Sequence, residues 1–497
     1  MKSGKMKRDK KPVEIERDVL IRYVYAKLSE APELAKKLTE INGQELKYRR
    51  VYFRIKKHVT DFLMGEKPGN IENRFLVMPG LRGVGKTTLL FQIYNYLRKE
   101  NIQENRILYF SADEIKTYLG ADIKDIVDVF IREVHNTSVV GLDKKLFILV
   151  DEAHYDREWS SVGKILYDQS KEIFMIFTGS SALSLEMNVD AARRSKREMV
   201  FPMNFSEYIT LKYNIFPPKG MAESLREFIF RPKTFFGYAS KNENLMKKNL
   251  IKLRKPVDKV FEEFLCVGGF PISLYLSKTD VYERIFDMVS RVIEKDVFSL
   301  QSFTSDTRNT IARILAFLAL QKPGEVSDMK LSQKLGTSPT MVRNILHILE
   351  KTHLIFSVKP YSGAGKIVRK PWKYYFLSPS IHAALMFKIG MFDEKNREIL
   401  GLLGENFAAS SFFRIKETMG MVTGVFYDPE EGGVDFILQK GERLIPVEVG
   451  IGKKTKGQIK KAIERYNSPY GIVIHGGEKI EIKGNIVYIP IITFSFL

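Results

Sequence analysis

The chain has 497 residues, of which 79 are Lys or Arg and 59 are Asp or Glu, so its formal net charge is +20. With 44% hydrophobic residues it can bury a core, which excludes wholesale disorder. Its one cysteine, Cys266, excludes a disulfide scaffold and a cysteine-rich zinc site. No apolar run approaches the roughly 20 residues of a membrane span, and the lysine-rich start lacks the apolar stretch of a secretory signal. We therefore expect a cytoplasmic protein that does not enter a membrane.

The positive charge is concentrated in four short stretches. Residues 2–11 carry a net charge of +5, and residues 247–255, 359–373 and 453–461 each hold five bases and no acid. Together these stretches account for the whole net charge. A single run of lysines is usually a solvated surface, but four runs favour a polyanionic partner. Duplex DNA is the partner that we expect.

The hydrophobic pattern predicts an α/β protein with several domains. Residues 1–70 contain the basic tail and then helices. In residues 71–211 short apolar strands alternate with helices, which predicts a buried parallel sheet. Residues 212–305 are expected to be helical. Residues 306–378 are expected to form three helices and a hairpin, and residues 379–497 a mixed α/β segment.

A glycine-rich segment follows the first predicted strand and opens a helix. From residue 80 to residue 87 it is GLRGVGKT, which fits the pattern G-x-x-x-x-G-K-[ST]. In such a loop, backbone N–H groups surround phosphate oxygens, the lysine reaches the β- and γ-phosphates and the hydroxyl binds Mg²⁺. The strand before it and the helix after it favour this interpretation over a chance glycine-rich turn. The residues expected to bind ATP are Gly80, Gly83, Val84, Gly85, Lys86, Thr87 and Thr88. Lys86 is also expected to be catalytic, and Thr87 to bind Mg²⁺.

Two acidic residues follow a second buried strand. The apolar residues 146–150 lead directly into Asp151 and Glu152. About 65 residues after a phosphate loop, such a pair is more than the polar end of a surface strand. We expect Asp151 to hold Mg²⁺ and Glu152 to orient or deprotonate the attacking water.

Polar residues also follow the next apolar run, residues 174–177. Thr178, Ser180 and Ser181 occupy a position from which a side chain can contact the γ-phosphate or the water. The pattern does not distinguish among the three, and a plain Gly-Ser loop is the alternative. Ser180 is the residue that we select as catalytic.

These motifs together resemble the P-loop ATPases of the AAA type, and most closely a family of archaeal and bacterial ATPases with a basic C-terminal half. In that family an arginine-containing segment, a turn similar to P-x-S-F-x-E-F/Y and a Gly-Gly-Phe-Pro segment in a helical lid follow the strands. Here they correspond to Arg193, Arg194 and Arg197, to residues 201–208 and to residues 268–271. The resemblance implies ATP hydrolysis. It also implies that one of these three arginines is an arginine finger acting on a neighbouring subunit of a homo-oligomer, and Arg193 and Arg194 are the two that we select; an exposed basic loop is the alternative.

Residues 331–377 have the pattern of a winged helix-turn-helix. Gly336 ends one predicted helix, and Ser338 with Pro339 begins the next. In that motif the second helix enters the major groove, and basic residues contact phosphates. The residues expected to face bases are Arg343, Asn344 and His347. Those expected to face phosphate are Lys359, Lys366, Arg369, Lys370 and Lys373. The alternative is a winged helix that contacts protein.

The last segment resembles the PD-(D/E)xK nuclease fold. Asp435 and Glu448 match its two hairpin acids, and Glu405 matches its helical glutamate. The resemblance implies a second divalent ion, Mg²⁺ or Mn²⁺, held by these three carboxylates. The position of the family's lysine is occupied by Gly450, so Lys453 or Lys454 is expected to reach in from the following loop, and Lys453 is the one that we select. An active endonuclease and an inactivated fold that binds DNA or a partner both remain open.

The sequence therefore predicts a P-loop NTPase parallel sheet with a helical lid, a winged helix-turn-helix and an α/β nuclease-like domain. The predicted function is Mg²⁺-dependent ATP hydrolysis coupled to binding of duplex DNA. An alternative from a different class is a nucleotide-dependent switch or scaffold with an inactive nuclease fold, whose C-terminal segments bind protein partners.

Overall fold

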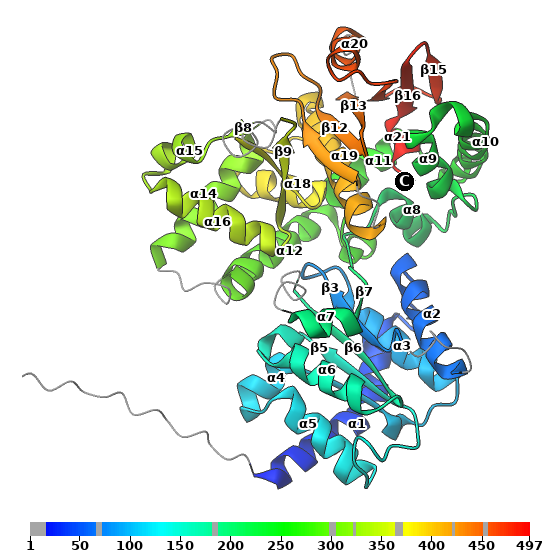
Figure 1. The fold of residues 1–497 in the computed structure, drawn as a ribbon, viewed down its shortest axis with the longest axis vertical. Coiled ribbons are helices and arrows are strands. Elements are labelled where there is room, and N and C mark those ends of the chain that lie inside the picture. Colours follow the sequence, from blue (N-terminus) through cyan, green and yellow to red (C-terminus); the bar gives the residue numbers. More distant parts are fainter. Residues whose placement is uncertain are drawn as a thin grey trace, which may run out of the picture.

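The computed structural model describes residues 16–65, 72–180, 187–297, 305–321, 325–362, 371–419, 423–450 and 456–497. The elements from α1 to β7 form one lobe, and those from α8 onward form a second lobe above it (Figure 1). In these ranges no helix combines the length and the apolar character needed to cross a membrane.

The first lobe is built on a parallel sheet with the strand order β4-β5-β6-β3-β7. Its strands are β3 (Phe75–Pro79), β4 (Ile107–Ser111), β5 (Leu146–Asp151), β6 (Ile173–Gly179) and β7 (Lys196–Arg197). Every residue of β3, β5 and β6 is buried, which explains their uninterrupted apolar sequences. Strand β6 lies between β3 and β5, so the segments that follow these three strands meet at one edge of the sheet.

Helices cover both faces of this sheet (Figure 1). The helices of the lobe are α1 (Arg17–Thr39), α2 (Arg50–Met64), α3 (Lys86–Lys99), α4 (Ala112–Glu114), α5 (Ile123–Val129), α6 (Trp159–Gln169) and α7 (Val189–Arg194); a short hairpin, β1 (Glu40–Ile41) and β2 (Gln44–Glu45), follows α1. Side chains alternate along β3 between two cores. Leu76 and Met78 pack with residues of α2 and α3, whereas Phe75 and Val77 pack with residues of α5 and α6.

The second lobe combines a helical part with a nine-stranded mixed sheet. Its helices are α8 (Phe205–Tyr213), α9 (Met221–Phe230), α10 (Pro232–Leu250), α11 (Val257–Val267), α12 (Lys278–Arg291), α14 (Ser305–Leu320), α15 (Asp328–Leu335), α16 (Pro339–Lys351), α18 (Pro379–Lys388), α19 (Arg397–Met419), α20 (Lys456–Arg465) and α21 (Ile491–Phe494). Its strands are β8 (Glu325–Val326), β9 (Ile355–Pro360), β10 (Trp372–Phe376), β11 (Thr423–Tyr427), β12 (Phe436–Lys440), β13 (Arg443–Gly450), β14 (Gly471–His475), β15 (Glu481–Lys483) and β16 (Ile486–Pro490).

The nine strands follow the order β15-β16-β14-β13-β12-β11-β9-β10-β8. Strand β9 belongs to the predicted helix-turn-helix segment and β11 to the predicted nuclease-like segment, yet they pair in parallel through Lys359 with Phe426 and Pro360 with Tyr427. Helix α18 packs against α11, α12 and α14. The predicted boundary after residue 378 therefore runs through a continuous sheet and a continuous helical layer.

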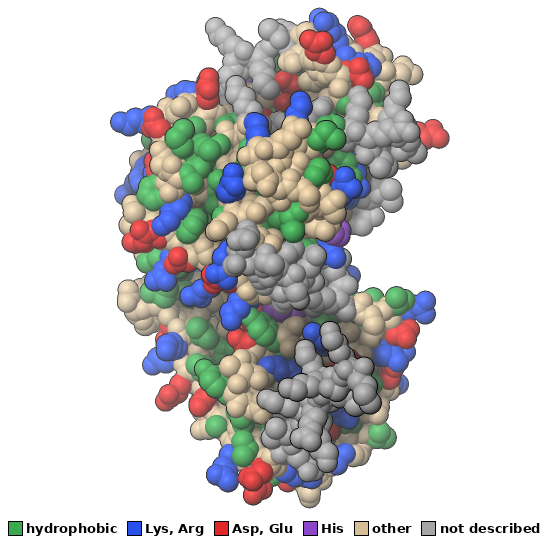
Figure 2. Space-filling view, turned by 90° about the vertical axis from the view of Figure 1, so that its left-hand side faces the viewer, with side chains coloured by type: hydrophobic (Ala, Val, Ile, Leu, Met, Phe, Trp, Pro, Cys, Tyr) green, Lys and Arg blue, Asp and Glu red, His purple; other side chains and the backbone are tan. Residues whose placement is uncertain are grey.

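The charged side chains of one face are visible in a space-filling view. Figure 2 shows Lys and Arg interspersed with Asp and Glu over both lobes. The described basic residues do not form one broad patch on this face. Of the four basic stretches, residues 247–255 are described in full, residues 359–373 and 453–461 in part, and residues 2–11 lie outside the described ranges.

Candidate functional site

The loop between β3 and α3 has the geometry of an anion-binding turn. Gly83 and Gly85 have φ values of +76° and +93°, a region that glycine enters without steric cost. At Gly80 an added Cβ would lie 2.4 Å from the backbone oxygen of Val200, so only glycine fits. Helix α3 begins at Lys86, and its first N–H groups point into the loop. The backbone can therefore surround a phosphate group here.

Oxygen ligands converge where the loop meets the ends of β5 and β6. The Thr87 hydroxyl donates to Asp151 Oδ2 at 2.6 Å. The Thr178 hydroxyl donates to Asp151 Oδ1, so both carboxylate oxygens are held in place. Hydroxyl and carboxylate oxygens are ligands that suit Mg²⁺, and Asp151 is buried at 5% exposure. Thr87 and Asp151 therefore fit the predicted magnesium site.

Lys86 lies inside the same loop. Its Nζ atom donates to the backbone oxygens of Gly80 at 2.8 Å and Leu81 at 3.1 Å, and the residue is buried. These carbonyls hold the ammonium group inside the loop.

Glu152 lies directly after Asp151 in a left-handed conformation, with φ +50°. Its backbone N–H donates to Thr178 Oγ1 at 3.2 Å. Its carboxylate lies 3.6 Å from Arg82 Nη1 and 3.4 Å from His154 Nδ1. A non-glycine residue at positive φ is held there by its surroundings, and here those surroundings orient the carboxylate.

Three residues around Glu152 were not selected from the sequence. Arg82 Nη2 donates to Asp296 Oδ1 at 2.8 Å, and His154 Nε2 lies 3.8 Å from the same oxygen. Burial disfavours the Asp296 carboxylate, but hydrogen bonds from His154 and Arg82 outweigh this and lower its pKa. Arg82 and His154 were detectable because they lie within or beside the motifs. Asp296 was not, because it lies 214 residues from Arg82.

Of the polar residues that follow β6, Thr178 is the one whose side chain contacts Asp151. Ser180, Arg193 and Arg194, which were predicted to be catalytic, have other surroundings. Ser180 is buried and its backbone N–H donates to His154 Nδ1 at 3.3 Å. Arg194 pairs with Asp168 at 2.5 Å. Arg193 is exposed on α7 and has no hydrogen-bond or ion-pair partner among the described residues. Ser181 lies outside the described ranges.

The helix-turn-helix segment presents a polar face on α16. Gly336 has φ +67°, and the Ser338 side chain accepts from the Met341 N–H at 3.2 Å, so a tight turn and a cap start the helix. The apolar side of α16 is buried, while its residues Arg343, Asn344 and His347 are exposed. The Arg343 guanidinium donates to Asp328 Oδ2 at 2.9 Å. Lys366, Arg369 and Lys370 lie outside the described residues.

The three carboxylates of the nuclease-like segment lie on or beside neighbouring elements of the second lobe. Glu405 accepts from the Tyr375 hydroxyl at 2.9 Å, and Asp435 accepts from the Val449 N–H at 2.7 Å. Glu448 is buried in β13. Within the described part of the chain no three His, Cys, Asp or Glu side chains form a group that could hold a metal ion. The second divalent ion therefore gains no support. Lys453 lies outside the described ranges.

Comparison with known proteins agrees with the geometry of the first lobe. The family described as "AAA domain" matches residues 72–209, and a "Domain of unknown function (DUF8612)" matches residues 258–395. The parallel sheet, the phosphate loop and this match define the class of protein: the first lobe is an AAA-type P-loop ATPase domain.

Full-length relatives identify the family. An uncharacterized protein of Methanocaldococcus jannaschii, MJ1637, is 34% identical over 454 residues, covering 89% of this chain and 88% of the relative. The chain therefore belongs to the same family as MJ1637. An uncharacterized protein of Haemophilus influenzae is 23% identical, covering 75% of this chain and 81% of that protein.

Two solved structures show weaker similarity. A Walker-type ATPase of Pyrococcus abyssi aligns with a TM-score of 0.42 at 13% identity, over 70% of this chain and 97% of the other. AMPPCP-bound DnaA from Aquifex aeolicus aligns with a TM-score of 0.24 at 18% identity, over 62% of this chain and 90% of the other.

Proposed function

We propose that this protein hydrolyses ATP at the phosphate loop in a Mg²⁺-dependent reaction. The observation that carries the proposal is the hydrogen bond between Thr87 and Asp151, which joins the loop to the carboxylate at the end of β5. Thr87 and Asp151 would hold Mg²⁺, which, when bound, neutralises the negative charge of the phosphates.

Each side chain has a defined task in this mechanism. The loop N–H groups and the Lys86 ammonium bind and orient the phosphates. Thr178 holds Asp151 through its hydroxyl. Glu152 accepts a hydrogen bond from the attacking water and aligns it with the γ-phosphate. Arg82 and His154 position that carboxylate through the contacts described above.

Two substitutions separate binding from chemistry. Lys86→Ala removes the ammonium that contacts the phosphates, and we expect nucleotide binding to be lost. Glu152→Gln keeps the size of the side chain but removes its negative charge, so binding should remain while turnover falls by about 10²-fold or more. Calorimetry with a nonhydrolysable ATP analogue and a phosphate-release assay measure the two effects. Unchanged affinity in Lys86→Ala would contradict the proposal.

We further propose that the second lobe binds duplex DNA. The observation that favours it is the exposed polar face of α16, where Arg343, Asn344 and His347 follow a capped turn. On the adjoining hairpin, Lys359 is exposed and lies 4.6 Å from the Trp372 ring centroid. This arrangement supports a helix in the major groove with lysines on the flanking phosphates. An active endonuclease and the arginine-finger role of Arg193 in a homo-oligomer stay predictions.

The DNA proposal makes a prediction about salt. Phosphate contacts release counterions, so Lys359→Gln with Lys373→Gln should weaken duplex binding and reduce the slope of log affinity against log salt by roughly 0.9 per lost contact. Fluorescence anisotropy at several salt concentrations measures this slope. The matched control, Lys99→Gln with Lys479→Gln, removes the same charge from exposed lysines elsewhere on the protein, each of which is in an ion pair. Affinity that is independent of salt would instead favour the protein-binding scaffold.

A further inference from the structure

A basic recess lies where α2 of the first lobe meets α9 and α19 of the second. It has a volume of about 160 Å³, and among the described residues that line it Glu207 is the only one with an acidic side chain. The arginines that line it are Arg49, Arg50, Arg54, Arg226 and Arg414. None of the residues of the phosphate loop contributes to this wall, so the recess is separate from the nucleotide site.

The single carboxylate is already engaged by one arginine. Arg49 donates from Nε and Nη2 to the two oxygens of Glu207, at 3.3 Å and 3.0 Å. Arg49 also donates to the backbone oxygens of Val84 at 2.7 Å and Phe201 at 2.9 Å. The pair is buried and fully hydrogen-bonded, so it is part of the structural framework behind the phosphate loop.

The other arginines of the recess outnumber the carboxylates that pair with them. Arg54 pairs with Glu198, which does not line the recess. Arg50 of α2 and Arg226 of α9 both line the recess and repel each other, and neither guanidinium forms an ion pair with a described carboxylate; the Arg50 guanidinium donates to the Ser206 hydroxyl. The nearest acids to Arg226 lie along its own helix, outside the recess. Two guanidinium groups of the recess thus have no ion-pair partner in the part of the chain that the structure describes.

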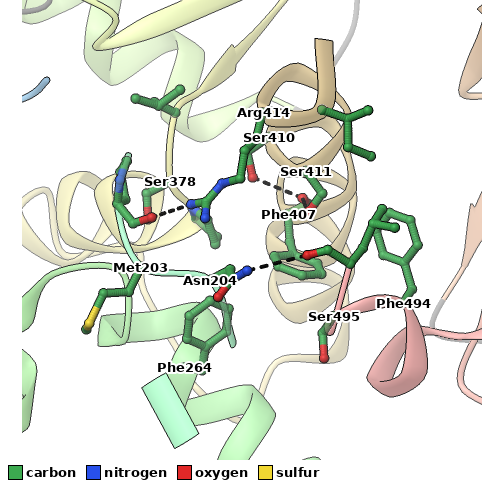
Figure 3. Close-up of a pocket in the computed structure, with 15 residues that line it drawn as sticks. Met203, Asn204, Phe264, Ser378, Phe407, Ser410, Ser411, Arg414, Phe494 and Ser495 are labelled. Carbon is green, nitrogen blue, oxygen red and sulfur yellow. Dashed lines mark hydrogen bonds between the residues drawn. The ribbon is translucent and has the colours of Figure 1, made fainter. Parts of the chain in front are cut away.

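Arg414 adds a further cation from α19. It reaches toward the segment before α8, as Figure 3 shows, and donates to the backbone oxygen of Pro202. Its guanidinium lies 5.2 Å from the Phe201 ring centroid and 3.9 Å from Glu207. Burial and the positive charges of Arg49, Arg50 and Arg54 outweigh the attraction of Glu207 and lower the pKa of Arg414 to about 10.

Backbone atoms near the recess do not balance this charge. Leu497 also lines the wall, and its backbone oxygen lies 3.5 Å from Asn204 Nδ2. Arg49 is matched by Glu207 and Arg54 by Glu198, so counting a terminal carboxylate there as a further negative charge still leaves three guanidinium groups facing one anion. Like charges this close cost free energy unless an anion lies between them.

We propose that this recess binds a phosphate-bearing anion of about the size of pyrophosphate. Planar guanidinium groups donate paired hydrogen bonds to phosphate oxygens, which lysines cannot match. The recess opens to solvent past Arg50 and Arg54, which are exposed, while Arg414 forms its inner wall. Because the arginines come from both lobes, the bound anion holds α2 against α9 and α19.

The experiment uses the full chain carrying Lys86→Ala, which removes binding of the probe at the phosphate loop. Pyrophosphate is titrated by isothermal calorimetry into this chain and into the same chain with Arg226→Gln or Arg50→Gln. Arg397→Gln is the matched control, because Arg397 lies on α19 like Arg414 but its side chain is 78% exposed and far from the recess. A thermal melt of each variant checks folding. Arg226→Gln should not lower the midpoint without ligand, since it removes a like charge.

We expect pyrophosphate to bind, each recess variant to weaken binding by about tenfold or more, and the control to leave it unchanged. A 20-base-pair duplex is then added as a competitor. Displacement that requires intact Arg50 and Arg226 identifies a nucleic-acid backbone as the source of the phosphate, and no displacement identifies a free phosphoanion. The proposal is overturned if pyrophosphate does not bind, or if it binds equally to the recess variants. It does not depend on ATP hydrolysis, so either proposal can fail alone.

Discussion

At the scale of single residues, Glu207 shows how a short motif encodes a buried charge. It lies in the turn that resembles P-x-S-F-x-E-F/Y, and Asn204 caps the same helix through a hydrogen bond to the Glu207 N–H at 2.9 Å. Burial disfavours the Glu207 carboxylate, but attraction and hydrogen bonds from Arg49, with help from Arg414 and Arg50, lower its pKa to about 2. The motif glutamate is therefore a structural ion-pair partner and not a catalytic group.

This lowered pKa predicts a pH dependence of stability. The folded-state pKa lies below the unfolded value near 4.3, so Glu207 stabilises the fold above about pH 4.3 and loses that contribution as pH falls toward 2. Glu207→Gln leaves buried guanidinium groups unpaired and should cost about 3–5 kcal/mol at pH 7. Urea unfolding between pH 3 and pH 7 measures both effects. The difference between wild type and variant should shrink toward pH 3, and a constant difference would contradict this account.

At the scale of elements, the segment predicted as a lid lies directly on the phosphate loop. Phe270 and Pro271 approach the Cβ positions of Gly83 and Gly85 to 3.6 Å and 3.7 Å. The turn η8 (Val292–Val297) supplies Asp296, which pairs with Arg82 of the loop. Glycine at both loop positions thus serves the backbone conformation and the close approach of the lid.

The Asp296 contact predicts a role in nucleotide retention. Asp296→Asn keeps the shape of the side chain but removes the charge that binds Arg82. The interaction between η8 and the phosphate loop should therefore weaken. We expect release of a fluorescent ADP analogue to be about tenfold faster in stopped-flow measurements. Asp287→Asn, at an exposed position on the preceding helix α12, is the control. Equal release rates in wild type and Asp296→Asn would show that this contact does not retain nucleotide.

At the scale of the whole molecule, one hydrophobic core crosses the predicted domain boundaries. Its buried residues run from α1 of the first lobe to α21 at the far end of the chain. Phe407 of α19 illustrates the connection, because its ring centroid lies 5.4 Å from that of Phe261 in α11 and 6.1 Å from that of Phe494 in α21. Segments predicted as a lid and as a nuclease-like domain therefore share one interior.

A shared interior predicts cooperative unfolding of the second lobe. Phe407→Ala should cost about 3–5 kcal/mol through lost burial and the cavity left behind. Hydrogen exchange should then accelerate in α11 and in β13 together, as mass spectrometry of peptides can detect. The control is Phe216→Ala, at a position 61% exposed. Acceleration confined to residues 379–497 would show that the segments unfold as separate domains.

Much of the nucleotide site could be predicted from the sequence, because its residues are local. Lys86 and Thr87 belong to one phosphate-loop motif, and Asp151 and Glu152 lie at the end of one strand. Because these strands are parallel, the segments that follow them meet at a common edge of the sheet. The polar residues after β6 show the limit, and the catalytic role of Ser180 stays a prediction. Three polar residues followed one strand, and only the three-dimensional arrangement showed that the Thr178 hydroxyl points at Asp151.

By itself the sequence determined the parallel sheet, the phosphate loop and the amphipathic helix α16, because periodicity and turn chemistry act over a few residues. Only the tertiary structure decided which distant residues share a site. It brought Asp296 onto the loop, joined β9 to β11 across a predicted boundary and gathered five arginines from both lobes into one recess. Such contacts depend on how whole elements pack, and no local pattern of charge or hydrophobicity specifies which elements will be neighbours. The net charge of +20 indicated a polyanionic partner, and the packing of the two lobes placed part of that charge in the recess.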